Sequence, residues 1–309
     1  MTMQHGPPVA IILMPVAGPR PSLSRAVESA VRQRDVRCLV WLGLHGADEE
    51  TAREAAHLES CHDTVKIVDV PRENSDLRTP ARPLNSLLRQ AIADFTLQAD
   101  VTWILRLDSD DVLASDDTLH EQIAAGGGVQ MITATAVFFD PAVGTAYRVG
   151  PHPSRRSWLV LRKHGAYCLA HPSNAVRLDL LRALPQVDFC DLDISFGEDL
   201  SFSCRLLAHV PEAQFRFVPA TYCFKELSTS TATATISLSE AAKAHWLLWR
   251  RNPALSAAEV LRGWSELCLG SLVGESHARR LLHRTLGFCG WLEDEAYEPV
   301  RRRLNELSD

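Results

Sequence analysis

Residues 103–117, "WILRLDSDDVLASDD", are the stretch from which the fold of this chain can be worked out. An apolar strand, interrupted once by Arg106, runs directly into Asp108, Asp110 and Asp111. Neighbouring carboxylates repel one another, so such a cluster normally needs a cation to neutralise it. A solvated turn that caps a following helix would explain one or two of these acids, but not three at the end of a buried strand. The stretch therefore predicts a strand that ends at a cation-binding site.

The chain on both sides of this stretch alternates between apolar strands and amphipathic helices. We expect strands at 9–16, 37–44, 64–70, 103–107 and 129–139, and helices at 22–34, 48–58 and 83–97. Continuous apolar strands separated by helices indicate an α/β protein with a mostly parallel sheet, flanked by helices on both faces. Ligands of such sheets bind beyond the carboxyl ends of the strands, where the three aspartates would lie.

The composition excludes several classes of protein. The net charge of −6 provides no general basic surface, so we expect no nucleic-acid partner. No run approaches the roughly 20 apolar residues of a membrane span, and the N-terminal run 9–16 is short and lacks a basic leader. The eight cysteines include no C-x-x-C pair and are expected to stay reduced. These features together predict a cytoplasmic, soluble protein.

Residues 144–165 differ in composition from the rest of the first half. The segment is rich in glycine, proline and basic residues, which are Arg148, Arg155, Arg156, Arg162 and Lys163. It is interpreted either as a solvated loop or as a mobile basic segment that meets phosphate groups near the acidic site.

The chain beyond Ser237 has helical periodicity at 239–251, 256–272, 276–292 and 298–307. This pattern predicts a first domain over 1–236 and a C-terminal helical region over 237–309. Peripheral membrane contact through these helices is left open.

A second acidic pair, Glu198 and Asp199, follows Gly197 in "SFGEDLSFSCRLL" (195–207), at the start of an expected amphipathic helix. Acidic residues suit a helix N-terminus, which explains their charge. It does not explain their relation to the aspartate cluster 90 residues upstream.

Taken in order over residues 9–232, these segments resemble the family 2 glycosyltransferases of the GT-A fold. The strand "VAIILMPV" and the helix "SLSRAVESAVRQR" match the opening of that family, and "ILRLDSDDVL" matches its metal motif. "HPSNAVRLDLL" with "GEDLSFSCRL" matches the acceptor side, and "FRFVPATYCFKELSTS" matches the closing strand. The ordered set is more specific than either acidic motif alone. The resemblance implies a GT-A (Rossmann-like) fold with a C-terminal helical appendage.

The resemblance also implies an activity, which is transfer of a sugar from a nucleotide-sugar donor to the hydroxyl of a glycan or small-molecule acceptor, with inversion. The donor leaves as a diphosphate, and Mg²⁺ or Mn²⁺ would stabilise its charge. Asp110 would bind this metal, Asp108 would contact the ribose or the metal shell, and Asp111 would support both. Asp199 would be the general base, with Glu198 orienting the acceptor.

Three further positions, Pro15, Val16 and Arg82, match residues that border the nucleotide in the family. Two positions depart from its pattern. Gly43 and Leu44 stand where relatives have an aspartate that reads the nucleobase, and Asp48 is the nearest acid. Leu227 stands where relatives often have a metal-binding histidine.

Two other functions fit part of the pattern. "LDSDDVL" also fits the nucleophile motif of haloacid-dehalogenase-like phosphatases, although three expected strands precede it here. A glycosyltransferase-like domain that binds a nucleotide sugar or glycan without turnover is the second alternative.

Overall fold

The computed structural model describes residues 7–70, 81–94, 102–142, 144–151, 173–184, 198–226, 238–251 and 290–308. Its strands are β1 (Val9–Gly18), β2 (Arg37–Ala47), β3 (Val65–Asp69), β4 (Thr102–Arg106), β5 (Asp111–Leu113), β6 (Met131–Asp140), β7 (Thr145–Pro151), β8 (Asn174–Arg177), β9 (Phe215–Glu226) and β10 (Gly290–Glu295). Its helices are α1 (Leu23–Val31), α2 (Glu49–Cys61), α3 (Ala81–Asp94), α4 (Thr118–Gly126), α6 (Leu178–Ala183), α7 (Glu198–His209), η5 (Glu212–Gln214), α8 (Leu238–Arg251) and α11 (Tyr297–Glu306). The five strands and three helices expected before residue 140 are confirmed, with ends shifted by a few residues.

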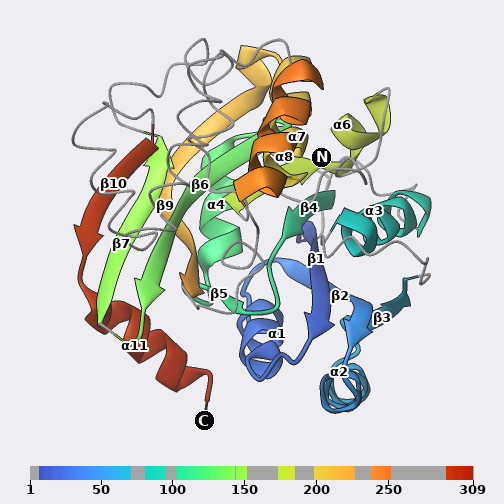
Figure 1. The fold of residues 1–309 in the computed structure, drawn as a ribbon, viewed down its shortest axis with the longest axis vertical. Helices are drawn as coiled ribbons and strands as arrows, with labels where there is room; N and C mark the ends of the chain where they lie inside the picture. Colours follow the sequence, from blue (N-terminus) through green and yellow to red (C-terminus); the bar gives the residue numbers. More distant parts are fainter. Residues whose placement is uncertain are drawn as a thin grey trace, which may run out of the picture.

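All the described strands belong to one curled sheet (Figure 1). Its main path runs β10-β7-β6-β8-β4-β1-β2-β3, while β9 lies on β6 and carries the short β5 on its other side. The half that contains β3, β2, β1 and β4 is parallel throughout. Antiparallel pairs begin where β8 joins β4 to β6. The carboxyl ends of β1 and β4 therefore lie side by side, which is where the α/β pattern places a ligand site.

Strand β1 shows why the sheet carries helices on both faces. Its first eight residues are all buried, and successive side chains point to opposite faces. Ile12 and Met14 pack with α1 and α2, whereas Ile11 and Leu13 pack with α3, α6 and α7. A strand that is buried on both sides explains the continuous apolar run in its sequence.

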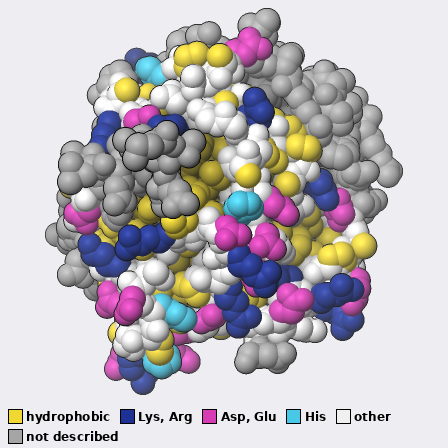
Figure 2. Space-filling view, turned by 180° about the vertical axis from the view of Figure 1, so that it is seen from behind, with side chains coloured by type: hydrophobic (Ala, Val, Ile, Leu, Met, Phe, Trp, Pro, Cys, Tyr) yellow, Lys and Arg dark blue, Asp and Glu magenta, His cyan; other side chains and the backbone are white. Residues whose placement is uncertain are grey.

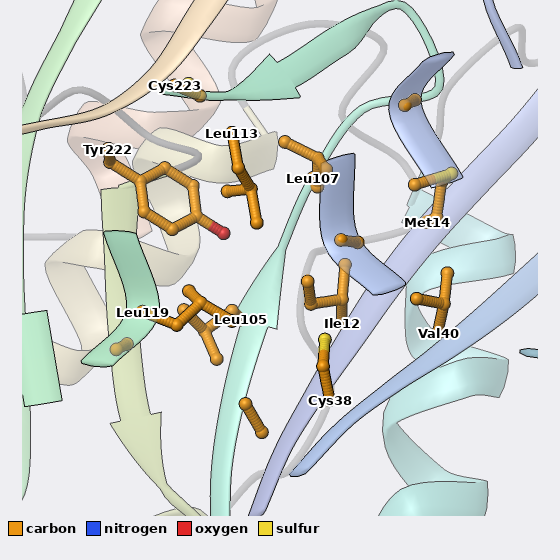
Figure 3. Packing of buried hydrophobic residues seen from close by; sticks show 14 of the residues in the cluster. Ile12, Met14, Cys38, Val40, Leu105, Leu107, Leu113, Leu119, Tyr222 and Cys223 are labelled. Atoms are coloured by element: carbon orange, nitrogen blue, oxygen red, sulfur yellow. The ribbon is translucent and has the colours of Figure 1, made fainter. Parts of the chain in front are cut away.

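The cluster around Ile12 extends to the acidic turn (Figure 3). Leu107 and Leu113 stand on either side of residues 108–111, and both side chains are fully buried in this cluster next to Tyr222. The core thus fixes both ends of the turn, and the polar residues between them are left at the edge of the sheet.

The C-terminal residues differ from the expected helical region. The helix expected over 276–292 is wrong at its end, because 290–295 form β10, which pairs antiparallel with β7. Residues 290–292 are the end of the expected helix, but their pairing with β7 makes them part of a strand. Helix α11 was expected and is present, and its Val300, with Leu307 directly after the helix, packs against β5, β6, β7 and β9 (Figure 1).

The expectation of a loop over residues 144–165 is also wrong in part. Residues 145–151 form β7 rather than a loop, and Arg148 of this strand pairs with Glu295 of β10 through Nε at 2.6 Å. The other four basic residues of the segment lie outside the described residues. No helix in the described part of the chain is long and apolar enough to cross a membrane.

Candidate active site at the carboxyl end of strand β4

The acidic residues lie in a tight turn that joins β4 to β5. The amide of Asp111 donates to the carbonyl of Asp108 at 3.0 Å, which closes the turn. The hydroxyl of Ser22, just before α1, donates to the carbonyl of Ser109 at 3.3 Å, and Tyr222 Oη donates to the carbonyl of Arg106 at 3.1 Å. The turn is thus held by two elements that are distant in sequence.

Two buried or half-buried cations neutralise part of the charge of this turn. Arg106 donates through Nε to Oδ1 of Asp108 at 2.7 Å. Lys225 of β9 donates through Nζ to Oδ2 of Asp108 at 2.9 Å and to Oδ2 of Asp111 at 3.1 Å. Asp111 and Lys225 are register partners in the β5–β9 ladder, so the backbone itself sets the lysine opposite the carboxylate.

The charges shift the ionisation of all three partners. Burial alone would raise the pKa of Asp108, but the charges of Arg106 and Lys225, with their hydrogen bonds, lower it well below its usual value. Burial raises the pKa of Asp111 well above its usual value, and the charges of Asp110 and Asp108 add to this effect against that of Lys225. Burial opposes the charge of Lys225, yet its three acidic neighbours raise its pKa well above the usual value.

The three aspartates fit a hard divalent cation in their chemistry and spacing. Asp108, Asp110 and Asp111 each offer a carboxylate oxygen, and these oxygens lie within 4.8 Å of one another. Asp110 makes no hydrogen bond or ion pair with the described residues. Among the same residues, Oδ1 of the fully buried Asp111 has no hydrogen-bond partner. A metal could therefore bind Asp110 and this oxygen of Asp111 without breaking a hydrogen bond among the described residues.

Pro15 and Val16 lie at the same edge of the sheet. Leu13 of β1 pairs with Arg106 of β4. Pro15 lies two residues after Leu13, and Asp108 lies two residues after Arg106, so both come at the ends of neighbouring strands. The side chain of Val16 is fully buried in the core. A contact of Val16 with a nucleotide would therefore have to come from its backbone.

Arg82 lies in the first turn of α3, and this part of the helix packs closely against Gly43 of β2. A Cβ atom at Gly43 would lie 3.0 Å from Cδ1 of Leu87 and 3.1 Å from Cβ of Pro83. Because Gly43 pairs with Pro15 in the sheet, the start of α3 lies near the edge that carries the acidic turn. A side chain at Gly43 would therefore fit only if Leu87 or Pro83 of α3 moved aside.

Asp48, the nearest acid, has a structural role. It is the N-cap of α2, and its Oδ1 accepts from the amide of Thr51 at 2.8 Å.

Glu198 and Asp199 are the first two residues of α7. This start agrees with the expected helix, and the next turn is tied to the sheet, since Nδ2 of Asn174 donates to the hydroxyl of Ser203 at 3.3 Å. The side chains of the acidic pair lie outside the described residues, so their roles remain predictions.

Lys225 and the function of Arg106 were missed by the sequence reasoning. Arg106 is the one charge in "WILRL", and Lys225 follows the apolar run "YCF" near the end of β9. A charge in a buried strand needs a buried counter-charge, and this is the signal that could have paired both residues with the aspartates.

Comparison with known proteins supports the fold. No family model and no curated protein sequence matches the chain. The 1–349 fragment of S. aureus TarS, in complex with UDP, matches with a TM-score of 0.53 at 14% identity, covering 90% of this chain and 70% of that one.

A longer TarS structure matches with a TM-score of 0.52 at 14% identity, covering 85% of this chain. This chain spans 43% of that longer one. A mannosyltransferase from Pyrobaculum calidifontis, in complex with GDP-Man and Mn²⁺, matches with a TM-score of 0.48 at 14% identity, covering 99% and 86% of the two chains. The likeness shows that the chain has the curled, helix-flanked sheet of the GT-A glycosyltransferases.

Proposed function

We propose that this protein is an inverting glycosyltransferase that moves a sugar from a nucleotide-sugar donor to an acceptor hydroxyl. The observation that carries the proposal is the cluster of Asp108, Asp110 and Asp111, whose oxygens lie within 4.8 Å of one another in a GT-A-like fold. TarS, which shares this fold, was solved with UDP. The strand end that carries the cluster is where α/β sheets bind nucleotides.

The residues of the cluster divide the work on the donor. Asp110 would hold Mg²⁺ or Mn²⁺ together with phosphate oxygens of the donor, because it is the carboxylate without a partner among the described residues. Such an ion supplies charge stabilisation for the leaving diphosphate. Asp108, held by Arg106 and Lys225, would contact the ribose, and Pro15, Val16 and Arg82 would border the nucleotide.

Acceptor activation is assigned to the start of α7. Asp199 would take the proton of the acceptor hydroxyl, and Glu198 would orient the acceptor. A base that acts opposite the leaving group leads to in-line displacement with inversion at the anomeric carbon. The acceptor is a glycan or a small molecule with a free hydroxyl.

The phosphatase alternative is opposed by the contacts of Asp108. That mechanism needs the first aspartate of the motif as a nucleophile. Both carboxylate oxygens of Asp108 accept hydrogen bonds, from Arg106 and Lys225, so neither oxygen is free to attack phosphorus.

Acidic and basic side chains are interspersed over the face of the molecule shown in Figure 2.

A panel of UDP-, dTDP-, GDP- and CDP-sugars tests this function in the presence of Mn²⁺. The matching donor should raise the melting temperature, since it binds only the folded state, and should release its nucleoside diphosphate when an acceptor is present. Asp110→Ala should abolish this turnover and keep the fold. Release of phosphate from monoesters, without release of a nucleoside diphosphate, would favour the phosphatase. Donor binding without any turnover would favour the binding module.

A further inference from the structure

The acidic turn already contains a cation at the position where a metal would be expected. Lys225 Nζ lies 2.9 Å from Asp108 and 3.1 Å from Asp111, and these carboxylates are two of the three candidate metal ligands. The three carboxylates and the two cations, Arg106 and Lys225, leave one net negative charge when all are ionised. That is a weak attraction for a divalent ion that must give up part of its hydration shell.

The lysine is held in this position by the sheet. Lys225 is paired with Asp111 across the β5–β9 ladder, and its strand neighbours Cys223 and Phe224 are buried. Its ammonium has carboxylate oxygens of two different residues as acceptors, so it cannot leave without uncovering both. The side chain of Asp111 is fully buried, so water cannot take the place of Lys225 as its partner.

We propose that Lys225 is the resident counter-ion of the acidic turn, which keeps the free protein from binding a divalent metal tightly until a donor diphosphate adds negative charge beside Asp110. The proposal rests on the proposed function for its second half, the role of the donor. Its first half concerns the metal alone. A like-charged ammonium next to two of the three ligands repels an incoming ion and occupies oxygens that would bind it.

The arrangement gives Lys225 a positioning role in the site. By holding Asp108 and Asp111 together, it keeps the turn closed when neither metal nor donor is bound. Asp110 is then the ligand left open to the ion, so metal and diphosphate would bind as a pair. A lysine whose role is purely structural would not make metal binding tighter when it is removed.

The test is titration of the full-length protein with Mn²⁺ alone, read from the EPR signal of the free ion. The wild type should bind weakly, and Lys225→Met should bind at least about tenfold more tightly, because two carboxylates lose a positive neighbour. Lys225→Arg keeps the charge and should remain close to the wild type. Adding Asp110→Asn to Lys225→Met should remove the gain. Equal affinity of the wild type and Lys225→Met would overturn the proposal.

A second comparison covers the case in which Lys225→Met fails to fold because Asp111 is left as a lone buried charge. Asp111→Asn and the double variant Lys225→Met/Asp111→Asn differ in the lysine, and neither leaves that charge behind. The double variant should bind Mn²⁺ at least about tenfold more tightly than Asp111→Asn, and equal affinity would again overturn the proposal.

The donor half is tested by adding UDP or GDP to the same titration. The nucleotide should tighten Mn²⁺ binding of the wild type by more than that of Lys225→Met, and an equal effect on both would overturn this half. The proposed function fails on a different result, the lack of binding and turnover of any nucleotide sugar, which leaves the titration with Mn²⁺ alone unaffected.

Discussion

Arg303, in the last helix, donates a hydrogen bond from Nε to the backbone carbonyl of Leu113 at 3.2 Å, across 190 residues of sequence. Leu113 ends β5, the three-residue strand that begins with Asp111. The same guanidinium lies 2.7 Å from Oδ1 of Asp116, and the arginine side chain is 7% exposed. The C-terminal helix therefore supports the strand that carries the acidic turn, although it is the most distant element in the chain.

We predict that Arg303→Met lowers the free energy of unfolding by about 1–3 kcal/mol, since it leaves the carbonyl of Leu113 without its donor and Asp116 without a buried ion-pair partner. Urea unfolding measures this loss. Arg302→Met, at an exposed position of the same helix, is the matched control and should stay within about 0.5 kcal/mol of the wild type. A similar loss in both variants would show that α11 matters through its helix propensity and not through this contact.

Gly43 should not tolerate a side chain, because Leu87 and Pro83 of α3 fill the space next to it. Gly43→Val is expected to cost about 1–3 kcal/mol of stability by overpacking. Leu87→Ala alone should cost about 2–5 kcal/mol, because Leu87 is fully buried. The double variant should lose less stability than the sum of the two single losses, by at least about 0.5 kcal/mol. Strict additivity in denaturant unfolding would contradict this steric conflict between residue 43 and Leu87.

Asp108 should make the stability depend on pH in the acid range. Folding lowers its pKa, so its ionised form contributes stability that is present above the unfolded-state pKa of about 4 and is lost as the pH falls toward the folded-state value. Asp108→Asn should therefore cost about 1–3 kcal/mol at pH 7.

This difference between the wild type and Asp108→Asn should shrink below pH 4, by at most about 1.4 kcal/mol per pH unit. Urea unfolding at pH 7, 5, 4 and 3 measures it. Asp110→Asn is the control, because it loses no hydrogen bond or ion pair among the described residues, and because the attraction of Asp110 to Lys225 and its repulsion of Asp111 oppose each other. It should differ from the wild type by less than Asp108→Asn at pH 7. A difference for Asp108→Asn that is the same at pH 7 and pH 3 would rule out the ion pairs as its cause.

Kinetic and binding measurements should separate the role of Asp199 from that of the metal site. A general base contributes typically 10²- to 10⁴-fold, so Asp199→Asn should lower sugar transfer by about that factor. Donor and Mn²⁺ affinity, measured by calorimetry, should remain near the wild-type values, unlike those of Asp110→Ala. If Glu198→Gln loses transfer instead, the base is Glu198. If neither variant is slower, the acidic pair only begins α7, and the mechanism proposed here is wrong.

The sequence by itself determined those parts of the fold that depend on local patterns of apolar and polar residues. The alternating pattern before residue 140 placed five strands and three helices, because each is defined by a period of burial within a dozen residues. The same reasoning located the acidic turn, since three carboxylates after an apolar strand stand out without knowledge of any neighbour. Fold class and the position of the candidate site followed from these local signals.

The tertiary structure decided what depends on pairing between distant segments. Residues 290–292 fit the end of a helical pattern, and pairing with β7 makes them, with 293–295, a strand. Lys225 is one of four lysines in the sequence, and no local pattern marks it as the partner of Asp111, which only the β5–β9 register sets opposite it. The counter-ion of the acidic turn was therefore invisible to local patterns, because charges attract through space and the chain that joins these two residues is 114 residues long.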